Sequence, residues 1–134
     1  MPIRYHSGTR RYASGSGQVM TTVVYGRQWS LSYQGRSWRP PTDVYETSEA
    51  VVVKMEIAGM SDDDFDITFG DGVLRVEGAR RDTAEKTGYH QLEIAYGEFS
   101  VEVQLPMPLL VDRIAATYEK GFLLITLPKD HRRF

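Results

Sequence analysis

Apolar and polar residues alternate over three long segments of the chain, and this alternation predicts β-strands. Every second residue is apolar in residues 51–57, 99–105 and 123–127. A period of two is the spacing of a strand that buries one face and turns the other toward solvent. Each of the three segments is therefore expected to form a strand with one buried face.

Shorter strand candidates lie at residues 43–46, 89–96 and 114–119, and Gly, Pro and Asp residues separate the segments. Their number and spacing predict an all-β fold, an antiparallel sandwich. Residues 108–113 are compatible with a single helical turn, and no other helix is expected.

The segment SDDDFDITFGDG, residues 61–72, has alternating aspartates like the early ligands of a calcium loop. Such a loop counted from Asp62 needs glycine at its sixth position and a bidentate glutamate at its twelfth. Those positions hold Ile67 and Val73. Without the sharp turn and the closing carboxylate the ligands cannot converge, so no calcium site is expected.

The same segment is better explained as the first half of a hairpin. Phe65, Ile67 and Phe69 alternate with polar residues, Gly70-Asp71-Gly72 supplies residues that tolerate positive φ, and residues 73–78 resume the strand spacing. The aspartates are then expected to face water.

Length and composition limit the function classes. A chain of 134 residues is one domain with room for an additional arm. The chain has no cysteine, which excludes disulfides, thiolate zinc sites and cysteine nucleophiles. No apolar run approaches the roughly 20 residues of a membrane span, and the N-terminus lacks a signal peptide pattern. We expect a cytoplasmic protein with no membrane contact.

Charge is divided unevenly along the chain. Residues 1–40 contain six arginines and no acidic residue, while residues 41–134 hold the other 10 basic and all 18 acidic residues, so +6 and −8 give the net charge of −2. A basic arm on an acidic body can bind nucleic acid or an acidic membrane, or lie on its own domain or a neighbour's. Because the arginines are dispersed, no nucleic-acid partner is expected.

Residues 1–40 also differ in composition. Residues 1–18 are rich in Gly, Ser and Arg without an apolar period, whereas residues 19–38 carry both tryptophans of the chain. We therefore expect a flexible, aromatic and arginine-rich N-terminal arm over residues 1–40, a sandwich over residues 41–129 and a short tail over residues 130–134.

Residues that carry chemistry are few. His6, His90 and His131 are scattered without a second ligand at metal spacing, so each is expected to be a surface histidine. Gly15-Ser16-Gly17 lacks the third glycine of a dinucleotide fingerprint, and no phosphate loop is present. Glu93 and Glu98 do not by themselves define an acid/base pair. The sequence predicts no enzyme, no cofactor and no metal.

The strand segments, taken in order, resemble the alpha-crystallin domain of the small heat shock proteins over residues 41–129. The motifs are Ala58-Gly59-Met60, Gly72-x-Leu74-x-Val76-x-Gly78-x-Arg80, Tyr96-Gly97-x-Phe99, Leu105-Pro106, Gly121-Phe122-Leu123 and Leu127-Pro128-Lys129. The resemblance implies an immunoglobulin-like sandwich that assembles into dimers and larger oligomers and holds unfolding client proteins without ATP.

Two departures from the family pattern bear on assembly. Val101 stands where many members have an arginine, so a salt bridge from that arginine across a dimer cannot form. The C-terminal Ile-x-Ile motif, which docks in a groove on a neighbouring domain, is missing after Lys129, so a large cage is not expected.

The resemblance also implies two interaction sites. In bacterial and plant members a loop between the strands carries a segment that pairs with the partner subunit's sheet, which predicts a homo-oligomer built from strand-exchanged dimers. The corresponding residues here are Tyr89, His90, Gln91, Leu92, Glu93, Ile94 and Tyr96. The groove that takes the Ile-x-Ile motif corresponds to Phe65, Ile67 and Phe69 on one edge strand and to Ile114, Ala116 and Tyr118 on another.

Client contact is expected from the arm, because aromatic residues spaced by Gly, Ser and Gln give adaptable apolar contacts. The candidate residues are Val23, Val24, Tyr25, Trp29, Leu31, Tyr33 and Trp38. The competing interpretation is that they pack against the sandwich or between subunits. An adaptor that binds one specific protein partner, and nucleic-acid binding through the arm, are the alternative functions.

Overall fold

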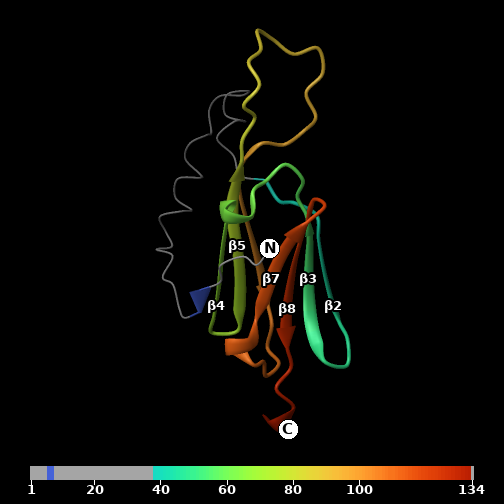
Figure 1. Ribbon diagram of the computed structural model, residues 1–134, viewed down its shortest axis with the longest axis vertical. Helices are drawn as coiled ribbons and strands as arrows, with labels where there is room; N and C mark the ends of the chain where they lie inside the picture. Colours follow the sequence, from blue (N-terminus) through green and yellow to red (C-terminus); the bar gives the residue numbers. More distant parts are fainter. Residues whose placement is uncertain (1–5, 8–37, 134) are drawn as a thin grey trace.

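The computed structural model describes residues 6–7 and 38–133, which form a sandwich of two four-stranded sheets (Figure 1). One sheet has the order β1-β4-β5-β6 and the other the order β2-β3-β8-β7. The strands are β1 (His6–Ser7), β2 (Thr42–Glu46), β3 (Ala50–Glu56), β4 (Phe65–Gly70), β5 (Val73–Arg80), β6 (Gly97–Gln104), β7 (Ala115–Glu119) and β8 (Phe122–Pro128). Three short 3-10 turns are η1 (Asp62–Asp64), η2 (Val111–Arg113) and η3 (His131–Arg133).

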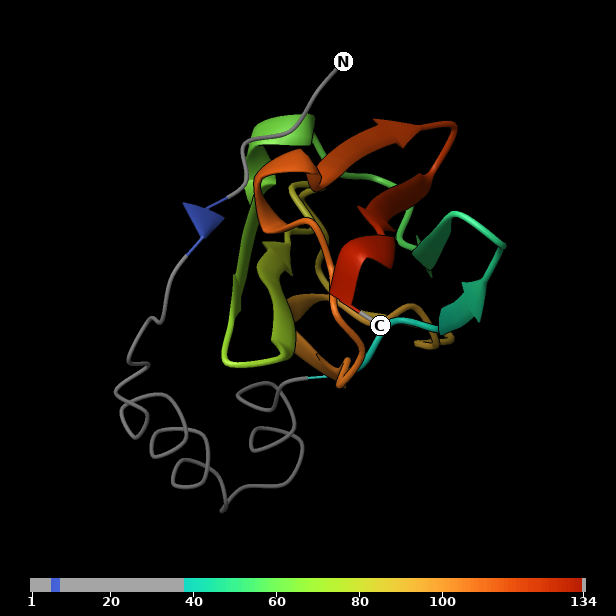
Figure 2. The same cartoon turned by 90° about the horizontal axis from the view of Figure 1, so that it is seen from below.

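All strand pairs are antiparallel except β1 with β4, which is parallel. Seen from below, the two sheets face each other across the core (Figure 2). The loop between β5 and β6 projects beyond one end of the sandwich, and the C-terminus lies at the opposite end (Figure 1). The predicted antiparallel sandwich is confirmed.

The core consists of the residues that the alternation places inward. Fully buried side chains come from both sheets: Val51, Val53, Met55, Ile57, Ile67, Leu74, Val76, Phe99, Val101, Leu123, Ile125 and Leu127. The three long segments with a period of two are thus strands with one buried face, as predicted. Val101 packs inside this core.

The predicted hairpin forms with a two-residue turn. Gly70 pairs with Val73 across Asp71 and Gly72, whose φ angles are 51° and 76°. Positive φ at both central residues is the turn geometry that matches the twist of the flanking strands. The aspartates before it form η1, where Asp64 accepts a hydrogen bond from the Ser61 backbone N–H at 2.9 Å.

The strand predicted at residues 89–96 is wrong for the single chain, because residues 81–96 form a loop without strand structure. A strand needs a neighbour that satisfies its backbone groups, and the described part of the chain offers none there. The helical turn anticipated at residues 108–113 is present as η2. No helix among the described residues is long and apolar enough to cross a membrane.

Candidate assembly surfaces

The loop between β5 and β6 exposes a cluster of apolar side chains. Tyr89 and Leu92 are each 54% exposed, Ile94 is 62% exposed and Tyr96 is 38% exposed. The other predicted interface residues, His90, Gln91 and Glu93, are exposed as well. Exposed apolar side chains that cluster are a common feature of interaction surfaces, whereas single exposed apolar residues are normal. The predicted dimer residues, which are consecutive apart from Ala95, all lie on this exposed loop.

Polar contacts inside the loop shape its first half. The Nζ of Lys86 lies 2.6 Å from a carboxylate oxygen of Asp82, and the Tyr89 hydroxyl donates to the same oxygen at 3.5 Å. The hydrogen bond from Lys86 lowers the pKa of Asp82 below its usual value, and the same hydrogen bond raises the pKa of Lys86. Both groups therefore stay charged at neutral pH, which keeps this half of the loop polar.

Strand β2 is an edge strand with unusual exposure. Thr42 is half-buried and the residues from Asp43 to Glu46 are exposed, so β2 has no buried face of its own. Val44 and Tyr45 are 45% and 46% exposed. Its only strand partner in the described part of the chain is β3. An edge strand with exposed apolar residues is a template for pairing with another chain.

The direction of the β2 backbone groups follows from two hydrogen bonds. Glu56 donates to the Pro41 carbonyl at 2.9 Å, and Thr47 donates to the Ala50 carbonyl at 2.8 Å. Hydrogen-bonded and non-bonded pairs alternate along an antiparallel ladder. Odd-numbered β2 residues therefore bond to β3, and Val44, which lies opposite Val53, directs its N–H and C=O to the open edge. This edge can accept a further strand.

The predicted groove residues come together between the two sheets. Phe65, Ile67 and Phe69 lie on β4, Ala116 and Tyr118 lie on β7, and Ile114 immediately precedes β7. All of them are buried except the half-buried Tyr118, and they belong to the core or pack against it. The rings of Phe65 and Tyr118 are 5.2 Å apart. The side chains are therefore packed within the sandwich rather than presented on its surface.

Two further contacts close this side of the sandwich. The Tyr118 hydroxyl donates to the Ile57 carbonyl at 2.8 Å and accepts from the Met60 N–H at 3.3 Å. On the outer edge of β4, β1 pairs in parallel, with His6 opposite Thr68 and Ser7 opposite Phe69. The backbone edge of β4 is thus already partnered by the chain's own N-terminal residues.

The predicted client-contact residues fall mostly outside the described residues. This applies to Val23, Val24, Tyr25, Trp29, Leu31 and Tyr33. Trp38 is described, and its half-buried ring meets Phe99 edge-on, with the centroids 5.8 Å apart. For Trp38, the competing interpretation of packing against the sandwich is the observed arrangement. Trp38, which the sequence pattern placed in the arm, thus packs against the sandwich.

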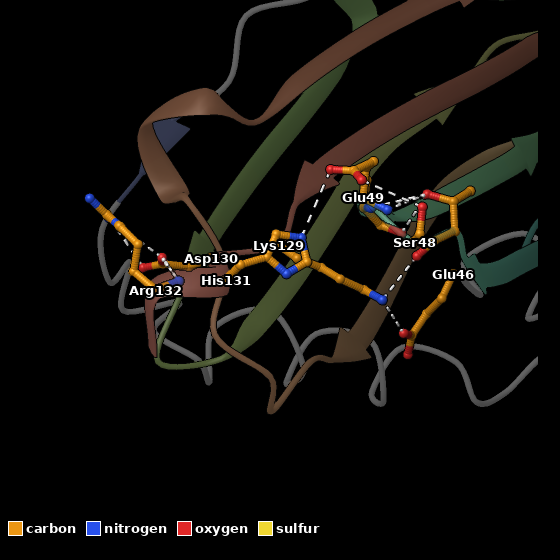
Figure 3. Close-up of polar contacts among 9 residues, drawn as sticks. Glu46, Ser48, Glu49, Lys129, Asp130, His131 and Arg132 are labelled. Carbon is orange, nitrogen blue, oxygen red and sulfur yellow. Dashed lines mark hydrogen bonds and ion pairs between the residues drawn. The ribbon is translucent and has the colours of Figure 1, made fainter. Parts of the chain in front are cut away.

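The C-terminal residues bind to the turn between β2 and β3 (Figure 3). Lys129 contacts the Glu46 carboxylate at 2.8 Å and donates to the Thr47 carbonyl at 2.9 Å, and His131 lies 3.9 Å from Glu49. Of the three histidines, His90 and His131 are exposed, as predicted. These contacts draw the chain after β8 across the end of the sandwich.

Asp130 is a buried acidic residue in this C-terminal segment. It is 4% exposed, and its Oδ1 accepts hydrogen bonds from the backbone N–H and Nε of Arg132 at 3.1 and 2.9 Å (Figure 3). The hydrogen bond to Asp130 raises the pKa of Arg132. A buried carboxylate that caps η3 and pairs with an arginine has a structural role. The predicted tail is therefore docked at its start.

Sequence reasoning missed the β2 edge and Arg80. In DVYET, residues 43–47, the adjacent apolar residues Val44 and Tyr45 break the alternation, which is the signal of a strand exposed on both faces. Arg80 was noted only as the last residue of a motif, and its guanidinium contacts residues distant in sequence. Periodicity reports on one element at a time, so it could not indicate such contacts.

Comparisons with known proteins agree on one family. The model of the Hsp20/alpha crystallin family matches residues 43–133. Small heat shock protein C4 of Rickettsia felis is 23% identical over 97% of this chain and 81% of its own length. Small heat shock protein C2 of the same organism is 34% identical over 69% of this chain and 62% of its own length.

Solved structures show the same sandwich. Heat shock protein 16.0 from Schizosaccharomyces pombe matches with a TM-score of 0.64 at 28% identity, covering 69% of this chain and 88% of that one. The hspA structure from Xanthomonas axonopodis matches with a TM-score of 0.65 at 26% identity, covering 69% and 95%. On the match over residues 43–133, the chain belongs to the Hsp20/alpha crystallin family of small heat shock proteins, from which a chaperone role follows.

Proposed function

We propose that this protein is an ATP-independent holdase, which binds unfolding proteins and suppresses their aggregation. The family supports a chaperone role, and the sequence contains no phosphate-binding motif that would couple the activity to nucleotide. A holder without nucleotide chemistry needs apolar surface that can meet many different sequences. The family consists of chaperones rather than enzymes, in line with the lack of a catalytic motif in the sequence.

The observation that carries the assembly part of the proposal is the exposure of the loop's apolar residues together with the open edge of β2. Leu92 and Ile94 are more than half exposed, and Val44 directs its backbone groups outward. We propose that residues 89–96 of one subunit add as a strand to β2 of another, giving a reciprocal, strand-exchanged homodimer. Such pairing satisfies backbone groups and buries apolar side chains at both ends.

Client binding is assigned to the arm. Residues 1–37 carry one tryptophan and four tyrosines, Tyr5, Tyr12, Tyr25, Trp29 and Tyr33. A large aromatic buries about 150–250 Å² on full contact. At roughly 25 cal/mol per Å², partial burial of several of them gives a few kcal/mol of gross interaction, which ordering of the arm partly offsets. Weak and multiple contacts suit a protein that must also release its clients.

The test compares the full chain with a variant that begins at Trp38, because the structure places that residue on the sandwich. In light scattering of a heated client without ATP, the full chain is expected to suppress aggregation, and the truncated variant to lose most of this activity at equal molar amounts. Strands β2 to β8 lie after the cut, so the variant should keep its β-rich circular dichroism and cooperative melting.

Equal protection by the truncated variant would assign client binding to the sandwich and refute the role of the arm. Protection of a single protein, with no effect on unrelated clients, would instead favour the adaptor function. A matched control replaces Trp29 and Tyr33 by serine in the full chain, which removes aromatic area without shortening the arm.

A further inference from the structure

Arg80 lies where the 81–96 loop leaves the sandwich and returns to it. It is the last residue of β5 and pairs with Gly97, the first residue of β6. Its guanidinium donates twice to the Ala95 carbonyl oxygen, from Nε at 3.1 Å and from Nη2 at 2.7 Å. It also donates from Nη1 to the Ala58 carbonyl oxygen at 3.1 Å, in the connection after β3. One side chain therefore joins both ends of the loop to the connection between β3 and β4.

Two aromatic rings lie against the same guanidinium. Its Cζ is 4.5 Å from the ring centroid of Trp38 and 5.5 Å from that of Tyr96. Trp38 is held in turn, because its Nε1 and its backbone N–H donate to the carbonyls of Gly97 and Glu98, each at 3.1 Å. Since Trp38 precedes β2, the guanidinium contacts the segment through which residues 1–37 join the sandwich.

The loop has few other attachments. Between described residues, the hydrogen bonds found from residues 81–96 to the rest of the sandwich are the two that Ala95 accepts. The bonds from Lys86 and Tyr89 to Asp82 lie within the loop, whose side chains are mostly exposed. A segment with little burial and so few attachments changes direction readily once they are lost.

We propose that Arg80 is a positioning residue that sets the direction in which the loop leaves the sandwich, and that its contact with Trp38 couples this direction to the arm. The proposal deepens the strand exchange proposed above and rests on it for its effect on assembly. Movement of Trp38 would remove the ring that lies against the guanidinium. The guanidinium would then hold the Ala95 carbonyl at the base of the loop less firmly. The segment carrying Leu92 and Ile94 would then no longer be presented in one orientation.

Arginine is needed for this task because of its shape. The guanidinium is planar, carries five N–H donors and stacks on aromatic faces, so it can bond two carbonyls while lying against two rings. The ammonium of lysine has the same charge but is compact and cannot span both carbonyls and both rings at once. Arg80→Lys therefore removes the geometry and keeps the charge.

The first experiment measures how firmly the base of the loop is held. It uses the full chain carrying Val44→Pro, which should block strand addition to β2, and follows chymotrypsin cleavage after Tyr89 under native conditions. Arg80→Lys is expected to raise the cleavage rate about tenfold, the scale of losing a charged hydrogen bond. The control is Arg81→Lys, which changes the exposed neighbouring arginine in the same way.

The outcomes separate the two proposals. Persistent dimers with Val44→Pro alone would refute the strand exchange before Arg80 is changed. Cleavage measured at high dilution, where the protein is monomeric, would still test the positioning role of Arg80. Equal cleavage rates for the Arg80 and Arg81 variants would refute the positioning role. If Arg80→Lys accelerated cleavage equally after Tyr89 and at sites throughout the sandwich, the positioning role would also be refuted, because this would show general destabilisation.

A second experiment tests the coupling to the arm. In a chain with Trp29→Phe, Trp38 is the remaining tryptophan, and its fluorescence emission should shift with Arg80→Lys and stay unchanged with Arg81→Lys. Trp38→Leu should also accelerate cleavage after Tyr89. In the double variant, Trp38→Leu should raise the cleavage rate by a smaller factor than it does alone, because Trp38 and Arg80 share one contact. Fully multiplicative factors would show that Trp38 and Arg80 act independently and would overturn the coupling.

Discussion

Replacing Val44 by proline is expected to convert assemblies of this protein into monomers while leaving the sandwich folded. The hydrogen bonds of Pro41 and Thr47 place the Val44 N–H on the open edge of β2, so proline removes no bond to β3. Proline is tolerated on an edge strand, but its ring and missing N–H obstruct a strand that pairs there. We expect the dimer dissociation constant to rise about a hundredfold or more, equivalent to roughly 3 kcal/mol.

Sedimentation velocity over a range of concentrations measures this shift. Val44→Ala is the matched control, because it trims the side chain and keeps the backbone N–H, so most of the association should remain. Deleting residues 83–95 should also give monomers, although it removes the Ala95 carbonyl that Arg80 binds. Dimers that persist in the proline variant would contradict pairing at β2 and direct attention to the edge of β7.

Replacing Gly78 by alanine is expected to destabilise the sandwich strongly. Gly78 lies on β5 between Phe65 of β4 and Phe99 of β6. A Cβ at this position would lie 2.8 Å from the Asp64 carbonyl oxygen and 2.8 Å from Cζ of Phe99. Overpacking of this kind destabilises by about 1–3 kcal/mol, which corresponds to a fall in melting temperature of roughly 4–20 °C.

Thermal melting followed by circular dichroism checks this result. Gly88→Ala provides the control in the same chain, since an added Cβ there meets nothing within 4 Å. It should leave the melting temperature unchanged or slightly higher, because alanine restricts the unfolded chain. A Gly78 variant that melts like the control would show that β5 can shift away from Phe99, and would contradict the close packing described here.

Local patterns were sufficient for most of the strands. The alternation in residues 51–57, 99–105 and 123–127 identified the buried faces, because a strand turns successive side chains to opposite sides whatever its neighbours are. The turn at Asp71 and Gly72 was likewise predictable, since residues that tolerate positive φ between two strand segments favour a two-residue hairpin. The family motifs added the immunoglobulin-like arrangement of these strands.

The same patterns could not reveal which edges remain open. Residues 89–96 have the spacing of a strand, but the described part of the chain supplies no neighbour for them, so they form a loop in the single chain. Conversely, β2 pairs on one edge and exposes both faces. Whether an alternating segment becomes a strand depends on a partner that can be far away in sequence or on another subunit.

By itself, then, the sequence determined the sandwich class, the hairpin at residues 65–78 and the buried side of each long strand, all of which follow from local geometry. Only the tertiary structure decided that Trp38 packs on Phe99, that the predicted groove residues lie within the core or, for Tyr118, pack against it, and that Arg80 joins Ala58 to Ala95. These contacts join residues as much as 61 positions apart, such as Trp38 and Phe99. Only folding brings such residues together, because no local preference of the chain reports what lies across the sandwich.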